Sequence, residues 1–194
     1  MASWSEFVAD EPRLAAAITA LLQQYGPGLG YLATVRADGG PRVHPVAPVI
    51  TDSGLFCFVV DSPKRRDLER DGRYALHSFP PEDSDDEAYL AGRARAVTNP
   101  AQVDQLARNL HAASQVDWRL FEFSVEVAML ARHGTGGATP LAGGRPGRPE
   151  VQVWLDPAGD RTPSVTRRRG ARARSRPSSV EPSGCPTGRR RSTS

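Results

Sequence analysis

A lysine stands at the start of a short basic helix that the sequence predicts after an apolar segment. Lys64 is the only lysine among the 25 lysine and arginine residues of the chain. It lies in the segment Asp61-Ser-Pro-Lys-Arg-Arg-Asp-Leu68. Ser62 is expected to cap the helix through its hydroxyl group. Pro63 suits the first helical position because it has no N–H group to leave unpaired.

The chemistry that this helix start predicts is anion binding. Lys64 and Arg65 fall among the unpaired N–H groups at the positive end of the helix dipole, where cations are normally unfavourable. Two cations at this end indicate that an anion belongs there, and a phosphate group suits the position best. The alternative interpretation is a solvated basic turn without a ligand.

Short strands must position this helix. Hydrophobic alternation and the turns between segments predict strands over residues 29–36, 42–50, 55–60, 73–79, 89–97 and 118–127. Pro45 and Pro48 cannot donate ladder hydrogen bonds, so the second strand must be bulged or must face something other than a neighbouring strand. A short run at 151–155 is a candidate for one last strand.

Two longer helices are expected beside the strands. Apolar residues at three- and four-residue steps predict a helix over 3–25, which Gly26-Pro-Gly28 ends. Asn99-Pro100 opens a second helix that runs to about residue 112. Short antiparallel strands with helices at their ends are typical of a small barrel or sandwich, so the fold class is mainly β with flanking α-helices.

Charge is distributed unevenly along the chain. Residues 161–194 carry ten arginines and one acid, whereas residues 1–160 carry 15 basic and 21 acidic side chains. The acidic folded part argues against a specific nucleic-acid-binding core, because such a core needs a basic face. The Arg/Ser/Pro-rich segment 160–194 has too little apolar surface to fold and is expected to be disordered.

Other features exclude several classes of protein. Cys57 and Cys185 are a poor disulfide pair and lack metal-ligand spacing. The acidic loop at 82–87 lacks the pattern of a calcium loop, so we expect a solvated loop and no metal. The polar N-terminus does not resemble a signal peptide, and no segment reaches the roughly 20 apolar residues of a membrane span. A cytoplasmic protein without membrane contact is therefore expected.

Four segments in order and at consistent spacing carry a family resemblance; they are residues 32–46, 55–68, 72–76 and 90–94. Together they resemble the pyridoxamine 5′-phosphate oxidase-like, flavin-binding split-barrel family over roughly residues 25–127. The resemblance implies a six-stranded antiparallel split β-barrel within a domain at 1–135. A linker at 136–159, with the short candidate strand, and the disordered tail at 160–194 would follow. It also implies a homodimer that binds FMN, or in some branches deazaflavin F-420, at the subunit interface.

The resemblance also assigns cofactor-binding residues. Lys64 falls on the family's basic ligand of the flavin phosphate, and Arg65 or Arg66 would assist it. The strand that lines the flavin is represented by Arg42, His44, Pro45 and Val46. The segment under the ring or the ribityl chain is represented by Val60, Asp61 and Ser62. His44 and His77 also suit a structural role on their strands, and Trp118, Phe121 and Phe123 suit the core or the dimer interface better than a substrate cage.

The chain departs from the oxidase itself at two places. Pro63 stands where the oxidase has an arginine, and the C-terminal segment with which the oxidase grips pyridoxal phosphate has no counterpart. The resemblance therefore implies an FMN-dependent oxidoreductase with an unidentified small-molecule substrate, and not vitamin B6 oxidation. The alternatives are an F-420-dependent reductase and a non-catalytic sensor or carrier. Catalytic residues stay unassigned, because the flavin itself carries the redox step.

Overall fold

The computed structural model describes residues 1–82, 84–109, 115–133 and 148–159. One antiparallel sheet of eight strands organises these residues. The strands are β1 (Gly30–Val35), β2 (Pro41–Val46), β3 (Pro48–Thr51), β4 (Gly54–Val60), β5 (Arg73–Ser78), β6 (Glu87–Ala96), β7 (Trp118–Arg132) and β8 (Glu150–Leu155). Their order across the sheet is β2-β1-β5-β6-β7-β4-β3, and β8 pairs with β7. The described helices are α1 (Trp4–Asp10), α2 (Pro12–Gln23), α3 (Pro63–Arg70) and α4 (Pro100–Asn109).

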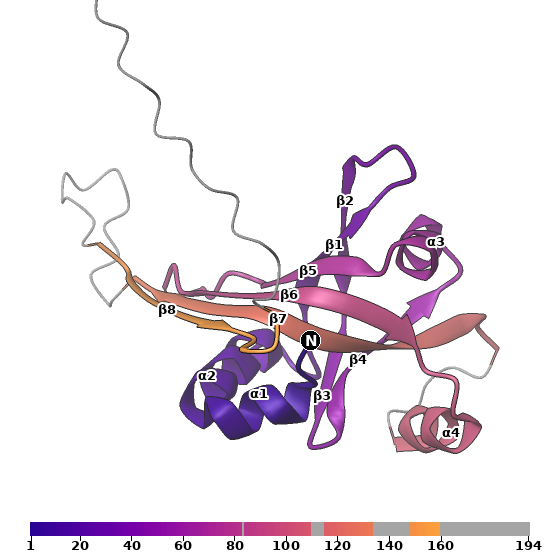
Figure 1. Ribbon diagram of the computed structural model, residues 1–194, viewed down its shortest axis with the longest axis horizontal. Helices are drawn as coiled ribbons and strands as arrows, with labels where there is room; N and C mark the ends of the chain where they lie inside the picture. The colour runs from indigo at the N-terminus through magenta and orange to yellow at the C-terminus, as the bar shows by residue number, and fades with distance from the viewer. Residues whose placement is uncertain (83, 110–114, 134–147, 160–194) are drawn as a thin grey trace, which may run out of the picture. The chain divides into compact units, whose positions relative to one another are not determined.

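The two ends of the strand order are joined through one residue. β2 pairs with β1, where Pro45 lies opposite Tyr31, and β3 pairs with β4, where Pro48 lies opposite Cys57. Only Ala47 separates β2 from β3. The chain therefore brings the ends of the sheet together, and the sheet curls into a half-closed barrel (Figure 1). The expected mainly β split barrel with flanking helices is confirmed.

The number of strands differs from the sequence prediction. The expected strand at 42–50 is two strands, because prolines without N–H groups cannot sustain one continuous ladder and the chain changes its pairing partner at Ala47. The candidate strand at 151–155 is confirmed as β8, which pairs with β7 from Val127 to Arg132. The sheet thus continues beyond residue 135.

The N-terminal helix predicted over 3–25 is also two elements. It breaks at Glu11, whose backbone has φ −132° and ψ 66°. Pro12 causes the break, because proline disfavours the helical conformation in the preceding residue and donates no hydrogen bond itself. Ser3 caps α1 and forms a reciprocal capping box with Glu6. The short α1 can therefore begin and end independently of α2.

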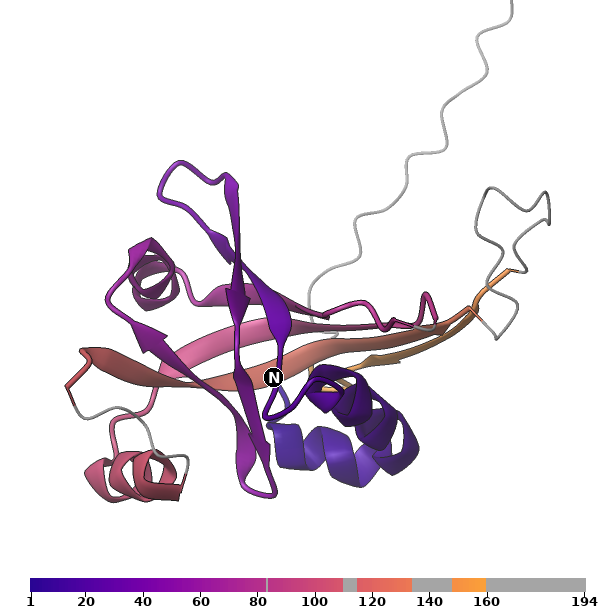
Figure 2. The same ribbon diagram turned by 180° about the vertical axis from the view of Figure 1, so that it is seen from behind.

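The core lies between the sheet and the first two helices, which occupy the same side of it in both views (Figures 1 and 2). Phe7 and Ile18 are fully buried there, and Trp154 of β8 packs on Phe7 with ring centroids 4.8 Å apart. Phe121 and Phe123 are also buried, so their expected place in the core is confirmed. β8 therefore helps to cover α1 as well as extending the sheet.

Some of the predicted segments lie outside the described residues. These are residue 83 of the acidic loop, residues 110–112 of the second predicted helix, residues 134–147 at the end of the predicted domain and in the predicted linker, Cys185, and the segment at 160–194 for which disorder was expected. Among the helices of the described part, none is long and apolar enough to cross a membrane.

Candidate functional site

The basic helix α3 follows directly after β4, as the sequence predicts. Pro63 occupies its first turn, and Ser62 is the N-cap with an extended backbone, φ −167° and ψ 164°. The Ser62 hydroxyl does not cap the helix, because it turns back toward β4 and donates to the Val60 carbonyl at 2.9 Å. The backbone N–H groups of Arg65 and Arg66 donate to the Ser62 carbonyl instead. The expected side-chain cap is therefore wrong.

Lys64 differs from the two arginines that follow it. Arg65 forms ion pairs with Glu69 at 3.3 Å and with Asp117 at 3.0 Å. Arg66 pairs with Asp61 at 3.1 Å. Lys64 is half-buried and makes no ion pair or hydrogen bond with any residue that the structure describes. Of the three cations in this turn, Lys64 alone therefore keeps its charge uncompensated within the described part of the chain.

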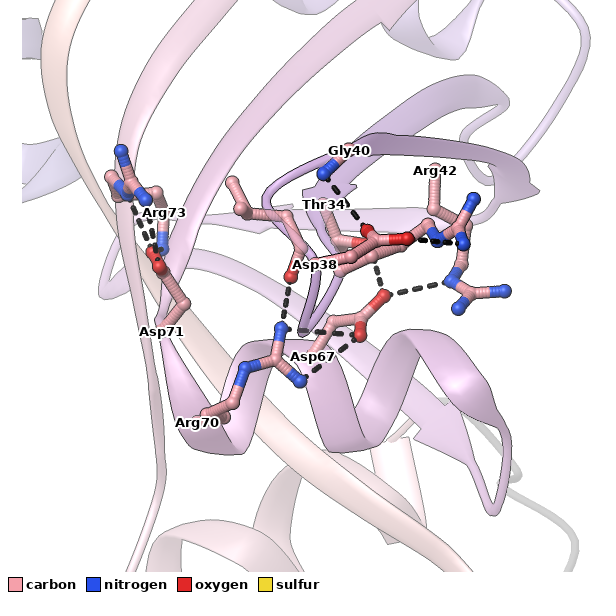
Figure 3. Close-up of polar contacts among 10 residues, drawn as sticks. Thr34, Asp38, Gly40, Arg42, Asp67, Arg70, Asp71 and Arg73 are labelled. Atoms are coloured by element: carbon pink, nitrogen blue, oxygen red, sulfur yellow. Dashed lines mark hydrogen bonds and ion pairs between the residues drawn. The ribbon is translucent and has the colours of Figure 1, made fainter.

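A buried carboxylate fixes α3 against the β1–β2 hairpin. Asp67 points from α3 toward the hairpin (Figure 3), where it accepts hydrogen bonds from the Thr34 hydroxyl at 3.0 Å and from the Arg42 Nε at 2.8 Å. Arg70 donates to the other carboxylate oxygen at 3.3 Å and also to the Val35 carbonyl. Burial opposes ionisation, but the hydrogen bonds from Arg42 and Thr34 outweigh it and lower the pKa of Asp67.

His44 lies beside this network on β2, opposite Leu32. Its Nε2 atom is buried and has no hydrogen-bond partner among the described residues. Burial, followed by the charges of Lys64 and Arg42, lowers the pKa of His44, so the ring is neutral at neutral pH. A buried ring nitrogen without a partner is unusual in a native protein. The structure thus brings Arg42, His44 and Lys64 together, as the family resemblance implies.

The other predicted site residues contribute in different ways. The Val46 side chain packs in the core, so only its backbone is available to a ligand. Pro45 is exposed on β2, and Val60 is 43% exposed at the end of β4. Asp61 is exposed, and its carboxylate forms an ion pair with Arg66. The sequence-based assignment of these residues to the cofactor stays a prediction.

The second strand histidine and the described cysteine have local explanations. The ring nitrogens of His77 contact the Ser78 carbonyl at 2.8 Å and Glu87 at 3.0 Å, which suits a structural role. Cys57 lies inside the barrel, and burial raises the pKa of its thiol to about 12 despite the charge of Lys64. Such a thiol is unreactive at neutral pH. No group of three or more metal-ligating side chains occurs among the described residues.

Two cavities formed by the described residues lie away from Lys64. A cavity of about 570 Å³ lies at the other end of α3, and one of about 590 Å³ lies between the N-terminal helices and β3. Neither is lined by Arg42, His44 or Lys64.

Sequence reasoning missed Asp67 and Thr34. Both are nearly inaccessible, with 4% and 2% of their surfaces exposed. α3 has eight residues and offers too few turns for a periodic pattern to show which of its charged residues faces inward. Thr34 occupies an inward position of β1, between two half-buried neighbours. Alternation along that strand is the one signal that indicated its burial.

Comparisons with known proteins agree with this geometry at the level of the fold. A haem-binding protein from Mycobacterium smegmatis is 18% identical, with a TM-score of 0.50 over 72% of this chain and 57% of that one. HupZ from Group A Streptococcus is 19% identical, with a TM-score of 0.51 over 62% of this chain and 95% of that one. A Clostridium acetobutylicum protein related to general stress protein 26 is 11% identical, with a TM-score of 0.51 over 78% and 95%. At these identities the likeness shows the fold alone.

The sequence comparison is more specific. No curated protein sequence matches the chain. The family model described as pyridoxamine 5′-phosphate oxidase, however, matches residues 14–128, which is more than half of the chain. This range runs from α2 to the middle of β7 and includes the Lys64 turn, the Asp67 network and His44. The chain therefore belongs to the pyridoxamine 5′-phosphate oxidase family.

Proposed function

We propose that this protein binds FMN at the start of α3 and uses it as an oxidoreductase on a small molecule. The observation that carries the proposal is the charge of Lys64 at the positive end of α3, which no described residue compensates, in a turn whose other cations are paired with carboxylates. A phosphate group is the natural partner of such a position. Family membership favours FMN as the molecule that carries the phosphate.

Each residue of the site has a role that its contacts support. Lys64 neutralises the phosphate, and Asp67 holds α3 and Arg42 in place so that the lysine is presented from a fixed helix. His44 offers a neutral ring beside these charges. FMN, when bound, supplies the hydride-transfer chemistry, while the protein supplies position and electrostatics. Arg65 is already held by two carboxylates and adds less free charge than the sequence suggests.

A second copy of the chain is the surface that we expect to enclose the cofactor. Apolar side chains stand exposed on the strands beside the site, namely Tyr31 at 36%, Val43 at 59% and Val60 at 43%. Exposed apolar groups of this kind are enriched where a protein meets a partner. We therefore extend the proposal to a homodimer with the flavin between the subunits.

Two other cofactors compete with FMN. Deazaflavin F-420 presents the same phosphate chemistry to Lys64 and stays the alternative flavin. Haem is the competitor suggested by one protein of similar fold, the haem-binding protein from Mycobacterium smegmatis. Haem iron takes a histidine nitrogen as an axial ligand. Both nitrogens of His77 contact acceptors and the Nε2 atom of His44 is enclosed, so among the nitrogens of these two strand histidines only His44 Nδ1 has neither a hydrogen-bond partner nor full burial within the described residues. Family membership favours the flavin.

Titration of the purified protein with FMN, followed by flavin fluorescence, tests the proposal. Replacement of Lys64 by alanine removes a charge-assisted contact worth about 1.5–3 kcal/mol, so the dissociation constant for FMN should rise about tenfold or more. Arg66→Ala is the matched control, because it removes a cation from the same turn whose charge Asp61 already compensates. Its effect should be much smaller.

The same titration separates the alternatives. Parallel additions of F-420 and of haem distinguish the three cofactors by their visible absorption. If Lys64→Ala leaves FMN affinity unchanged, or if both variants weaken it equally, the phosphate does not bind at Lys64. If the wild-type protein takes up haem and no flavin, the proposed oxidoreductase activity is wrong. Bleaching of bound FMN by a reductant, followed by reoxidation, would support turnover.

A further inference from the structure

β8 forms an edge of the sheet and has no part in the proposed flavin site. One side of this strand pairs with β7, from Val127 to Arg132 (Figure 1). No described residue pairs with its other side. The region that matches the family ends at residue 128, so β8 lies outside it. The free side of an edge strand presents backbone N–H and C=O groups that can pair with a further strand.

The backbone groups on this free side belong to Val151, Val153 and Leu155. In an antiparallel ladder, the N–H and C=O groups of successive residues point alternately to the two sides of a strand. The Asp156 N–H group donates to the Glu126 carbonyl of β7 at 2.9 Å. Even-numbered residues of β8 therefore bond β7, and the three odd-numbered residues direct their N–H and C=O groups away from it.

The same three residues carry exposed apolar side chains. Val151 is 50% exposed, Val153 57% and Leu155 63%. They project from the face of β8 opposite to Trp154, which is buried. The apolar stripe continues onto β7, where the half-buried Met129 lies opposite Val153. Adjoining exposed apolar side chains mark interaction surfaces, whereas scattered single ones are ordinary.

β8 lacks the residues that normally protect an edge strand. Natural edge strands are blocked by lysine, by proline or by bulges. The strands at the two ends of the strand order contain prolines, which are Pro41 and Pro45 in β2 and Pro48 in β3. β8 has the sequence Glu-Val-Gln-Val-Trp-Leu, with its one charge at the start and with no lysine, proline or glycine. Valine and tryptophan favour strands. The free side of β8 is therefore suited to pairing.

A second copy of β8 fits this side because the strand is complementary to itself. In an antiparallel pair about a two-fold axis at Val153, this residue meets its counterpart, and Val151 meets Leu155 of the second copy. All the N–H and C=O groups on the free sides of both strands are then bonded. Apolar side chains lie opposite apolar side chains on the exposed face, which stabilises the pairing.

The flanking residues limit this pairing to β8. Pro149 and Pro157 stand at the next odd-numbered positions, where they supply no N–H group to continue the ladder. Glu150 lies opposite Asp156 of the second copy, but the Asp156 carboxylate is buried and already paired with the Met1 amino group at 2.8 Å. Because each copy uses its free side in the pair, the contact closes at two copies.

We propose that two copies of this chain join their sheets edge to edge through β8. This contact is separate from the homodimer proposed around the flavin, which uses exposed residues of β1, β2 and β4, and it does not depend on FMN. A single pair of short strands forms a small interface, and small interfaces are typical of weak association. The pairing should therefore depend on protein concentration.

Analytical ultracentrifugation of the full chain without FMN, over a series of concentrations, tests the proposal. Val153→Lys places two like charges at the axis and removes an apolar contact, so the dissociation constant of this pairing should rise about tenfold or more. Val116→Lys is the matched control, because Val116 is 45% exposed and lies outside β8. Its mass should equal that of the wild type. Equal masses of wild type and Val153→Lys at every concentration overturn the proposal.

Cysteine cross-linking tests the register of the pair. The variants are made in a Cys185→Ser background, and the thiol of Cys57 is buried. In Val153→Cys the two thiols lie across a hydrogen-bonded pair, with Cα atoms about 5.5 Å apart, where a disulfide can form. In Leu155→Cys they are about 13 Å apart along the strands. Mild oxidation should join Val153→Cys chains and leave Leu155→Cys chains single, and equal cross-linking of the two variants overturns this pairing.

Two further measurements separate this inference from its alternatives. Val153→Lys should leave FMN affinity unchanged, and Lys64→Ala should leave the β8 pairing unchanged, so failure of the flavin site overturns the proposed function alone. Amide hydrogen exchange at Val151 should be fast in monomeric Val153→Lys and slower in the associated wild type. Slow exchange at Val151 in the monomer would show that the chain itself covers this side of β8, and it overturns the pairing with a second copy.

Discussion

Replacement of Asp67 by asparagine is the sharpest test of how α3 is held. The variant keeps the shape of the side chain but removes the charge that Arg42 and Arg70 share and that Thr34 contacts. The carboxylate is 5% exposed, whereas the Arg42 side chain is 30% exposed and recovers part of its hydration. Breaking a buried ion pair costs about 3–5 kcal/mol. With the rehydration of Arg42, we expect a loss of about 2–4 kcal/mol in the free energy of unfolding.

Urea denaturation followed by tryptophan fluorescence measures this loss. With a denaturant slope of about 2 kcal/mol/M, a loss of about 3 kcal/mol lowers the urea midpoint by about 1.5 M. Asp38→Asn is the matched control, because Asp38 also pairs with an arginine, Arg36 at 2.6 Å, but both side chains are about half exposed. Such a pair contributes about 0–1 kcal/mol. Equal midpoint shifts in the two variants would refute the reasoning, because burial would then make no difference.

Two further predictions use the same titration. The pKa of Asp67 is lowered in the folded state, so its stabilisation is present above the unfolded value of about 3.9 and is lost as pH falls through the lower folded value. The midpoint difference between wild type and Asp67→Asn should therefore narrow below about pH 4, and a constant difference would contradict this account. Gly92→Ala places a Cβ atom 2.1 Å from the Ser124 carbonyl oxygen at the β6 bulge and should cost about 3 kcal/mol. Gly39→Ala is the control: its Cβ atom meets open space, so only the strain of a positive φ angle remains, and it should cost about 1 kcal/mol of stability. Equal losses of stability in the two variants would show that the structure relieves the contact of the new Cβ atom with Ser124.

The local features of the site are predictable because they depend on neighbouring residues. Pro63 and the apolar strand before it predict the start of α3, and the glycine at φ 76°, Gly72, follows its end. Lys64 stands out as the basic residue at this helix start. The wrong prediction of a side-chain cap at Ser62 also concerns an interaction between neighbouring residues. Whether a hydroxyl caps a helix depends on one backbone conformation, and here the hydroxyl bonds Val60 instead.

The partners of the charged residues are not predictable from local sequence. From the sequence, Arg65 and Arg66 are expected to bind the phosphate together with Lys64. In the structure the charge of Arg65 is compensated by Asp117 and that of Arg66 by Asp61. Asp117 lies 52 residues from Arg65 along the chain. Ion pairs of this kind depend on the register of β4 with β7, which places Val60 opposite Trp118.

The sequence by itself determined the mainly β class, most of the strand positions and the basic turn with Lys64, because alternation, prolines and glycines act within a few residues. Tertiary structure alone decided that Asp67 is buried and that Lys64 has no ion-pair partner among the described residues. The physical reason is that the net charge of a position depends on which distant side chains approach within hydrogen-bonding distance. That approach is fixed by strand register and by closure of the barrel at Ala47.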